Sequence, residues 1–219
     1  EQCLALSTNI ADDCTLCTSS TVITASGSQF AFRTKVDQCI SGDCQDDVPI
    51  GCWNTSEVTD MRWAFLDKAL FNDSIKCWNV ASVTNMDYMF FSASNFNQPL
   101  NDWNVASVTA MNRLFNQATA FNQPLDDWNV ASVTKMPFMF YEATDFNQCL
   151  STWADKTPPN VSVYGIFEKS GCPKKDALAN VSPWCLEDEQ CSASLTEEAP
   201  IAPLTKNPKQ KKGSKKNNN

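Results

Sequence analysis

Cysteine is the residue type with the widest chemical scope in this chain of 219 residues, which has eleven cysteines and no histidine. The spacings Cys14-x-x-Cys17 and Cys39-x-x-x-x-Cys44 could supply four thiolates to one zinc ion. Two disulfides suit the same spacings, and abundant cysteine without histidine favours disulfides formed in an oxidising compartment. Because the total is odd, one thiol stays free, pairs between chains or has lost its partner.

Catalytic chemistry has few candidates. Without histidine the chain cannot build the Ser–His or Cys–His pairs that activate nucleophiles, and it lacks the usual ligands of zinc hydrolases. Asp102 and Asp127 are 25 residues apart and could form a carboxylate pair or a weak calcium site. A position on the solvent side of a repeat column explains them better. We therefore predict a protein that is not an enzyme, with no cofactor and no metal.

An internal repeat must position these residues. Tryptophan recurs every 25 residues, at Trp53, Trp78, Trp103, Trp128 and Trp153. The unit reads W-N-V-A-S-V-T-x-M-x-x-M-F-x-x-A-x-x-F-N-Q-P-L-x-D. A period between about 20 and 50 residues indicates a stacked array in which each unit buries the apolar face of its neighbour.

Two elements are expected in each unit. Apolar residues from Met86 to Ala93 follow helical spacing, which predicts one short helix. The segment from Phe96 to Trp103 contains Pro99 and is too short for a second helix, so it predicts a strand that pairs with the same strand of the next unit. The predicted fold class is therefore an α/β solenoid with one short strand and one short helix per 25-residue coil and disulfide-rich caps.

The same register predicts disulfide pairs. Cys52 and Cys77 are 25 residues apart, each directly before a tryptophan. Neighbouring strands lie roughly 4.8 Å apart, within the ~4.4–6.8 Å between Cα atoms that a disulfide requires. We therefore pair Cys52 with Cys77; in the alternative, their side chains diverge and each finds another partner. For Cys149, one coil before the C-terminal cysteines, Cys172 is the expected partner.

The outward face of the predicted helices carries the candidate binding residues. With the apolar stripe inward, two positions per unit face solvent. They hold Trp63, Tyr88, Arg113 and Phe138 in one column, and Leu66, Phe91, Asn116 and Tyr141 in the other. An idle surface would be polar, whereas these columns are mostly aromatic, as in a recognition patch. In the alternative, loops, caps or glycans cover them. The predicted binding residues are Trp63, Tyr88, Phe91, Arg113, Phe138 and Tyr141.

Four regions follow from the repeat and its flanks, because an exposed end of such an array needs a cap. Phe32, Val36 and Ile40 have the spacing of a short amphipathic helix that could cover the first coil. The repeat register slips by about two residues near Pro158 and Pro159. The regions are an N-terminal cysteine-rich cap (1–50), the repeats (51–171), a C-terminal cysteine-rich cap (172–196) and a disordered lysine-rich tail (197–219).

Charge separates the tail from the body. Residues Lys206 to Asn219 hold six lysines and no acid, whereas the rest of the chain has 11 basic and 25 acidic residues, a net charge of −14. The tail could attract a polyanion such as an acidic polysaccharide, a mineral surface or a nucleic acid; in the alternative it is solvated without a partner.

The expected location is secreted or at the cell surface. No apolar run approaches the ~20 residues needed to cross a bilayer, and any secretion signal has been removed or was never present. Four asparagines begin Asn-x-Ser/Thr sequons. Asn54 sits in a predicted turn and is the least accessible, so the predicted glycosylation sites are Asn72, Asn160 and Asn180.

The units W-N-V-A-S-V-T-N-M-x-x-M-F and F-N-Q-P-L-x-D-W resemble the BspA-like repeat family over Phe30 to Cys172. The resemblance implies a solenoid akin to leucine-rich repeats, displayed outside the cell, with adhesion or protein binding in some members and no catalytic residues. We predict an extracellular binding or adhesion module that recognises protein or glycan through its aromatic face. The alternative is a structural component of a cell-surface coat or wall, anchored by the basic tail. The oligomeric state is not indicated.

Overall fold

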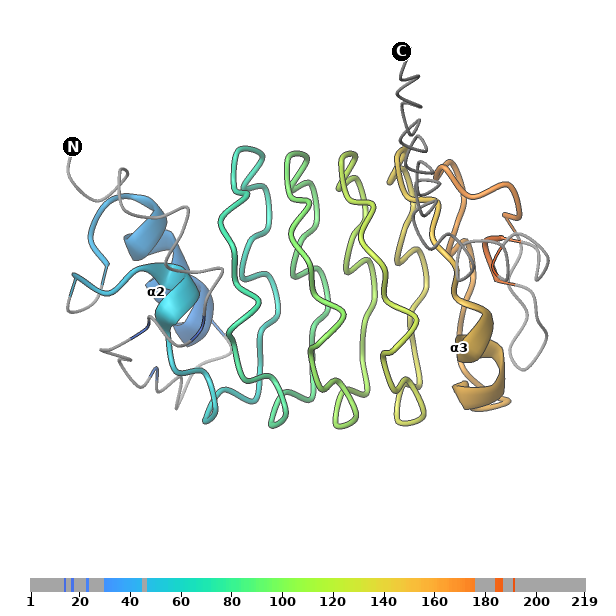
Figure 1. The fold of residues 1–219 in the computed structure, drawn as a ribbon, viewed down its shortest axis with the longest axis horizontal. Helices are drawn as coiled ribbons and strands as arrows, with labels where there is room; N and C mark the ends of the chain where they lie inside the picture. Colours follow the sequence, from blue (N-terminus) through green and yellow to red (C-terminus); the bar gives the residue numbers. More distant parts are fainter. Residues whose placement is uncertain are drawn as a thin grey trace, which may run out of the picture.

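Consecutive repeat units stand side by side as coils of one continuous stack (Figure 1). The computed structural model describes residues 14, 17, 23, 30–44, 47–175, 184–186 and 191. Its helical elements are α2 (Ala31–Ile40), the 3-10 turn η3 (Ile50–Cys52) and α3 (Ser151–Lys156). The helix α2 lies at the N-terminal end of the stack and α3 toward the other end, so the coils between them carry the repeats.

The predicted α/β solenoid is wrong. Neither the segment from Met86 to Ala93, expected as a helix, nor the segment from 96 to 103, expected as a strand, forms that element. Within the described part of the chain no coil contains a strand, and neighbouring coils are joined by isolated parallel bridges. They join Asp60 to Asn85, Asn85 to Ala110, Ala110 to Lys135 and Lys135 to Ser162.

Left-handed residues explain why the coils are built from turns. Each of four successive coils has two residues, four positions apart, with φ between 50° and 61°. These pairs are Trp63 with Asp67, Tyr88 with Ser92, Arg113 with Gln117, and Phe138 with Glu142. A residue with positive φ cannot continue a right-handed helix or an extended strand. The predicted helix is therefore interrupted in each of these coils.

A hydrogen-bond ladder between coils replaces the missing helix and strand. The backbone N–H groups of Met61, Trp63, Phe65 and Asp67 donate to carbonyls of the next coil, at Asn85, Asp87, Met89 and Phe91, over 2.8 to 3.2 Å. Of the intervening N–H groups, those of Ala64 and Leu66 donate to carbonyls three residues back, and that of Arg62 donates to the Asp60 side chain. The pattern recurs coil after coil, so the buried backbone is satisfied without regular secondary structure.

Aromatic columns fill the interior. The rings of Trp53, Trp78 and Trp103 stack with centroids 6.2 and 6.4 Å apart. A parallel column runs from Phe65 through Phe90, with centroids 5.2 Å apart. The apolar stripe from Met86 to Ala93 is fully buried, as its periodicity predicts. In this series of turns the positions i, i+3, i+4 and i+7 face the core. The predicted burial of these residues is therefore confirmed, although the predicted helix is wrong.

Asparagine side chains serve the backbone where a strand was expected. The N–H of Asn97 donates to Oδ1 of Asn72 (2.9 Å), and the amide of Gln98 donates to the Asn72 carbonyl (2.9 Å). The same bonds recur one coil later, to Asn97. Since a side chain takes the N–H that a strand would use, the coils are joined here by an amide ladder and not by a sheet.

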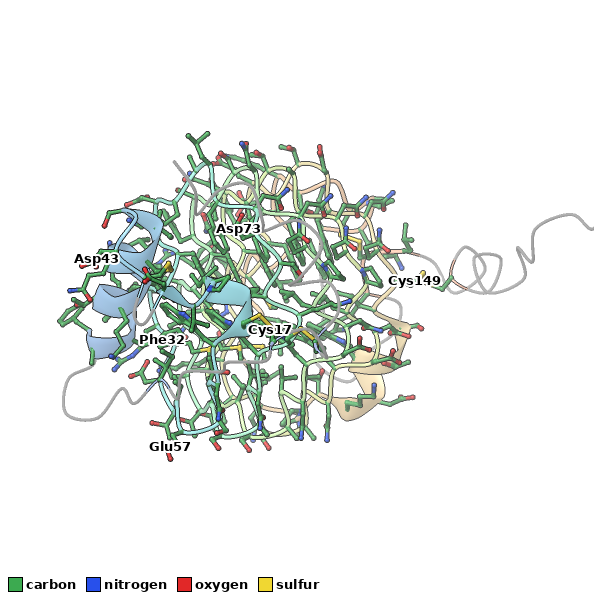
Figure 2. All side chains as sticks on the ribbon, turned by 60° about the vertical axis from the view of Figure 1, so that its left-hand side comes forward. Cys17, Phe32, Asp43, Glu57, Asp73 and Cys149 are labelled. Carbon is green, nitrogen blue, oxygen red and sulfur yellow. A yellow bond between two sulfur atoms is a disulfide. The ribbon has the colours of Figure 1, made fainter. Side chains whose placement is uncertain are left out.

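The N-terminal end is closed by α2 and by disulfides. In α2, Phe32, Val36 and Cys39 are buried, so the predicted amphipathic helix is confirmed, with Cys39 and not Ile40 on its inner face. The Phe32 ring packs edge-on against Trp78 with centroids 5.4 Å apart. Phe32 and Cys17 both lie at this end of the stack (Figure 2).

The predicted bond between Cys52 and Cys77 is wrong. Each of these cysteines binds one member of the Cys14-x-x-Cys17 pair, because the bonds are Cys14–Cys77 and Cys17–Cys52. An N-terminal segment thus spans the two coils and ties each of them separately. Cys39 is bonded to Cys44, so none of the four candidate zinc thiolates is free to hold a metal.

The C-terminal pairing also differs from the prediction. Cys149 is bonded to Cys191, and Cys172 to Cys185, in place of the expected bond between Cys149 and Cys172. Tertiary packing brings Cys191 of the C-terminal cap to Cys149, in place of Cys172, which is nearer in the sequence. The register slip near Pro158 is confirmed, since Lys135 bridges to Ser162, 27 residues on. Cys3, Asn180 and the tail 197–219 lie outside the described residues.

The left-handed positions predict an effect on stability. Asp67 is exposed at φ 61° and its side chain makes no hydrogen bond or ion pair with the described residues, so Asp67→Val should lower the free energy of unfolding by about 1–2 kcal/mol through backbone strain. Asp67→Gly should cause no loss. The control is Asp102→Val, at an exposed position without positive φ. Chemical denaturation is the measurement, and equal losses in both valine variants would contradict the interpretation.

The disulfides predict a second effect. Removing the Cys14–Cys77 bond with paired serine substitutions should cost roughly 4 kcal/mol of stability, because the bond closes a loop of 63 residues. Removing Cys39–Cys44, which closes a loop of 5 residues, should cost roughly 2 kcal/mol. Peptide mapping without reduction tests the connectivity itself. A cross-linked peptide joining Cys52 to Cys77 would show that the pairing described here is incorrect.

Candidate functional site

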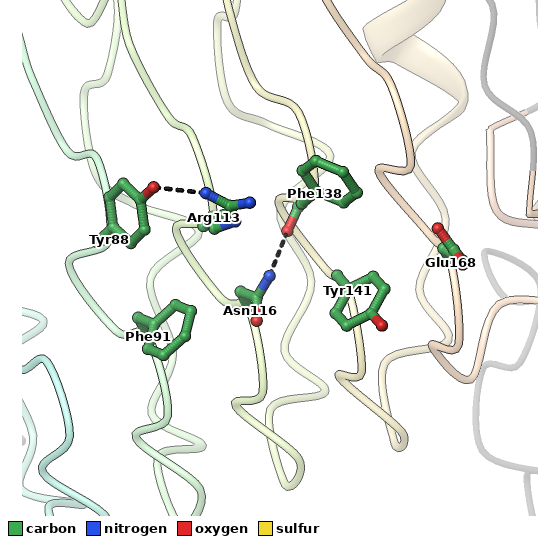
Figure 3. Close-up of a pocket in the computed structure, with 7 residues that line it drawn as sticks. All are labelled: Tyr88, Phe91, Arg113, Asn116, Phe138, Tyr141 and Glu168. Carbon is green, nitrogen blue, oxygen red and sulfur yellow. Dashed lines mark hydrogen bonds between the residues drawn. The ribbon is translucent and has the colours of Figure 1, made fainter.

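One open pocket of about 520 Å³ lies on the face of the stack that carries the two outward columns (Figure 3). Five of the six predicted binding residues line it, drawn from three successive coils. The lining residues are Tyr88, Phe91, Arg113, Asn116, Phe138, Tyr141 and Glu168. The repeat therefore brings side chains 25 and 50 residues apart in sequence to one place.

Three of these residues owe their position to left-handed backbone. Tyr88, Arg113 and Phe138 have φ of 59°, 50° and 56°. Positive φ is uncommon for a non-glycine residue and a genuine outlier for a bulky one, and such residues persist where the surrounding structure holds them. Here the ladder between coils holds them, since all three N–H groups donate to the next coil. The same conformation that prevents a helix thus orients the candidate binding side chains.

Arg113 lies between two aromatic rings. Its guanidinium carbon is 5.5 Å from the centroid of the Tyr88 ring and 4.9 Å from that of Phe138. Its Nη1 donates to the Tyr88 hydroxyl over 2.5 Å. The structure gives Arg113 no carboxylate partner among the residues that it describes. The pocket therefore holds a cation stabilised by π faces, with guanidinium donors left over.

Asn116 creates the hollow. The outward column that holds Phe91 and Tyr141 has this shorter side chain between them. Asn116 is 4% exposed, and its Nδ2 donates over a long 3.4 Å to the Phe138 carbonyl. Among the residues that the structure describes, none donates a hydrogen bond to its Oδ1. The base of the hollow thus offers an amide with an unused acceptor, between two rings.

Lys169 fixes the Tyr141 wall. Its Nζ donates to the Tyr141 hydroxyl over 2.6 Å and to Glu142 over 2.9 Å, and it lies 4.8 Å from the centroid of the Tyr141 ring. The hydrogen bond to Tyr141, followed by that to Glu142, raises the pKa of Lys169. The hydrogen bond from Lys169, followed by that from Gln117, lowers the pKa of Glu142. The ammonium therefore stays charged across the neutral range, and the ring stays anchored.

Gly165 makes room for the Phe138 wall. A Cβ at this position would lie 2.7 Å from two carbons of the Phe138 ring. Gly165 also has φ of 62°, at the position that Phe138 occupies one coil earlier. The last coil thus replaces a bulky outward residue with glycine, and the Phe138 ring occupies the space that a side chain would need.

Trp63 is placed outside the pocket. Its ring stacks on Phe30 with centroids 5.2 Å apart, and the guanidinium of Arg62 lies 5.1 Å from its centroid. It belongs to the junction with the N-terminal cap. Two lining residues, Asn116 and Glu168, were not among the predicted binding residues. Asn116 was left out because the prediction favoured aromatic side chains. Glu168 was left out because the two-residue register slip hid its place. Correcting the register at Pro158 was the signal that could have found Glu168.

Two of the three predicted glycosylation sites are described and exposed, at Asn72 and Asn160. At Asn72 the side-chain oxygen is occupied by the amide ladder, through the N–H of Asn97, and no bond is recorded for its nitrogen. Glycosylation at these positions stays a prediction.

Comparison with known proteins covers the same repeats that build the pocket. Residues 34–153 match the family model described as "Mycoplasma protein of unknown function, DUF285". The chain belongs to this family. The DUF285 match includes all lining residues of the pocket except Glu168. No curated protein and no solved structure is significantly similar to the chain. Of the helices in the described residues, none is both long and apolar enough to span a bilayer.

The Phe138 wall predicts a local effect. Gly165→Ala should displace the Phe138 ring, because the new Cβ has no room beside it. Gly42→Ala is the matched control, since Gly42 also has positive φ but has nothing within 4 Å of an added Cβ. Both variants should lose stability by about 1–2 kcal/mol. Only Gly165→Ala should shift the ring-proton resonances of Phe138, and unchanged resonances would show that the wall is not held by this contact.

Proposed function

We propose that this DUF285 protein is a non-enzymatic extracellular module that binds a protein or glycan partner through the aromatic pocket. The observation that carries the proposal is the convergence of Tyr88, Phe91, Arg113, Phe138 and Tyr141 around one hollow. A display role of the BspA-like kind belongs to the same proposal. No step of bond making or breaking is needed for it.

The composition of the pocket suits recognition. Tyrosine, tryptophan and arginine are the residue types that carry most binding energy at interfaces, and aromatic rings offer contact area at a low entropic cost. Apart from Glu168, which is exposed, the pocket side chains are half-buried or buried, and they are held by the ladder, by Lys169 and by the space beside Gly165. A site with its side chains already ordered loses little freedom on binding, so more of the contact energy becomes affinity.

An extracellular location is supported by the cysteines. Five disulfides join ten of the eleven cysteines and tie both ends of the stack. Disulfides persist in oxidising compartments and are rare where thiols are kept reduced. The bonds are therefore consistent with a protein that works outside the cytosol, where a displayed binding face meets its partner.

The test compares binding of the intact chain and of Phe91→Ala plus Tyr141→Ala to a panel of purified extracellular proteins and polysaccharides. Loss of the two rings should weaken binding at least about tenfold, since buried aromatic anchors at an interface each contribute about 2 kcal/mol or more. Leu70→Ala, an apolar side chain that is 86% exposed and away from the pocket, is the control and should bind like the wild type.

Binding that does not change in the double variant would contradict the pocket as the binding site. Loss of attachment to a cell surface on deletion of residues 206–219, with the double variant still attached, would favour the structural role in a coat or wall instead.

A further inference from the structure

Resting on the proposed binding function, we infer that the pocket takes a carboxylate-bearing pyranose unit of an acidic polysaccharide. The carboxylate pairs with Arg113, and the sugar ring occupies the hollow above Asn116, between Phe91 and Tyr141. Four features of the pocket carry this inference: its width, its unpaired cation, its polar base and its small extent.

The hollow is wide enough for one sugar ring. In the core column directly behind it, Phe90, Phe115 and Phe140 have centroids 5.4 and 5.6 Å apart, which measures the spacing of these coils. Phe91 and Tyr141 belong to the outer two coils, so the space over Asn116 spans two such steps. Non-bonded carbon contacts form at about 3.5–4.0 Å. A chair-shaped pyranose ring, thicker than a flat aromatic ring, fills this space, and its C–H groups pack against the neighbouring rings.

Charge complementarity points to a single carboxylate. Arg113 has one guanidinium nitrogen bonded to Tyr88 and makes no ion pair with any residue that the structure describes. The fork of a guanidinium matches a carboxylate in geometry, and such a pair is strong where rings exclude water. Glu168 borders the pocket one coil beyond Phe138. Negative charge on the ligand is therefore favoured beside Arg113 and disfavoured beside Glu168.

The polar base distinguishes a sugar from a simple acid. Asn116 is buried, and none of the described residues donates a hydrogen bond to its Oδ1. This acceptor at the base of the pocket can take a hydrogen bond from a ligand donor, and a sugar hydroxyl is such a donor. A densely charged polyanion such as a nucleic acid offers repeated phosphates, which would meet Glu168. A ring with one acid group and several hydroxyls fits both ends of the pocket.

The size of the site favours a glycan over a protein. Seven residues line the pocket, whereas a stable protein interface uses about 20–30 residues on each side.

The body of the chain has a net charge of −14, which would repel an acidic polymer at long range. The six lysines from Lys206 onward reverse that repulsion locally. The same polymer can thus be attracted by the tail and recognised by the pocket.

Calorimetric titration of the full chain tests the inference. The probes are short oligomers of galacturonic, glucuronic and mannuronic acid, the same oligomers with each carboxyl reduced to a neutral alcohol, and polyglutamate as a polyanion without sugar rings. At least one oligouronate should bind at least about tenfold more tightly than its reduced form. Polyglutamate should not compete for the pocket.

Variants assign the effect to Arg113. Arg113→Gln should weaken binding of the oligouronate at least about tenfold and weaken binding of the reduced oligomer much less, because only the acid loses its ion pair. Arg113→Lys, which keeps the charge without the fork, should lie between the two. Arg62→Gln is the matched control, because Arg62 also lies over an aromatic ring but outside the pocket. Thermal melts of the variants verify that each one is folded.

The outcomes separate this inference from the function on which it rests. Equal binding of the acidic and neutral oligomers, unaffected by Arg113→Gln but lost in Phe91→Ala plus Tyr141→Ala, would overturn the acid specificity and leave the binding function standing. Binding of no oligosaccharide, with a protein of the panel bound through Phe91 and Tyr141, would overturn the glycan and again leave the function standing. Binding that does not depend on the rings for any probe would overturn both.

Discussion

Each 25-residue coil of this protein must end at the equivalent position one step along the stack, so that its backbone N–H groups meet the carbonyls of the next coil. The bonds from Met61 to Asn85 and from Phe65 to Met89 are two steps of that ladder. Aromatic stacking, the amide ladder of Asn72 and Asn97, and the burial of the core all depend on it. Because every layer repeats the same translation, a residue type kept at one position becomes a continuous column.

Left-handed residues connect this constraint to the face that carries the candidate binding residues. A chain of turns satisfies its backbone only if some N–H groups are directed along the stack, and residues of positive φ achieve this in each coil. At Tyr88, Arg113 and Phe138 the same backbone conformation directs the side chain outward. The proposed binding site therefore lies at the few outward positions where coils differ. Arg113 and Asn116 stand where the coils on either side carry aromatic rings, and these two exchanges turn a ridge of rings into a hollow with a cation.

The ends of the stack need a different solution, because there the ladder has no next coil. At the N-terminal end, Phe32 of α2 covers the tryptophan column, and two disulfides from Cys14 and Cys17 tie the cap to the first two coils. At the other end, Trp184 packs edge-on against Phe167. Disulfides between cysteines 63 and 35 residues apart tie the N-terminal cap to the stack, and one between cysteines 42 residues apart ties the C-terminal cap.

The sequence by itself determined the 25-residue period, the buried columns and the two outward columns that line the pocket, since each follows from a repeated spacing. Only the tertiary structure decided the rest. The spacing from Met86 to Ala93 is common to a helix and to these turns, so it could not reveal left-handed backbone. Cys52 and Cys77 form disulfides with a distant segment, and the Trp63 ring stacks on Phe30 of the cap. A repeat specifies what recurs within the stack, whereas contacts made across the ends of the stack have no periodic signal.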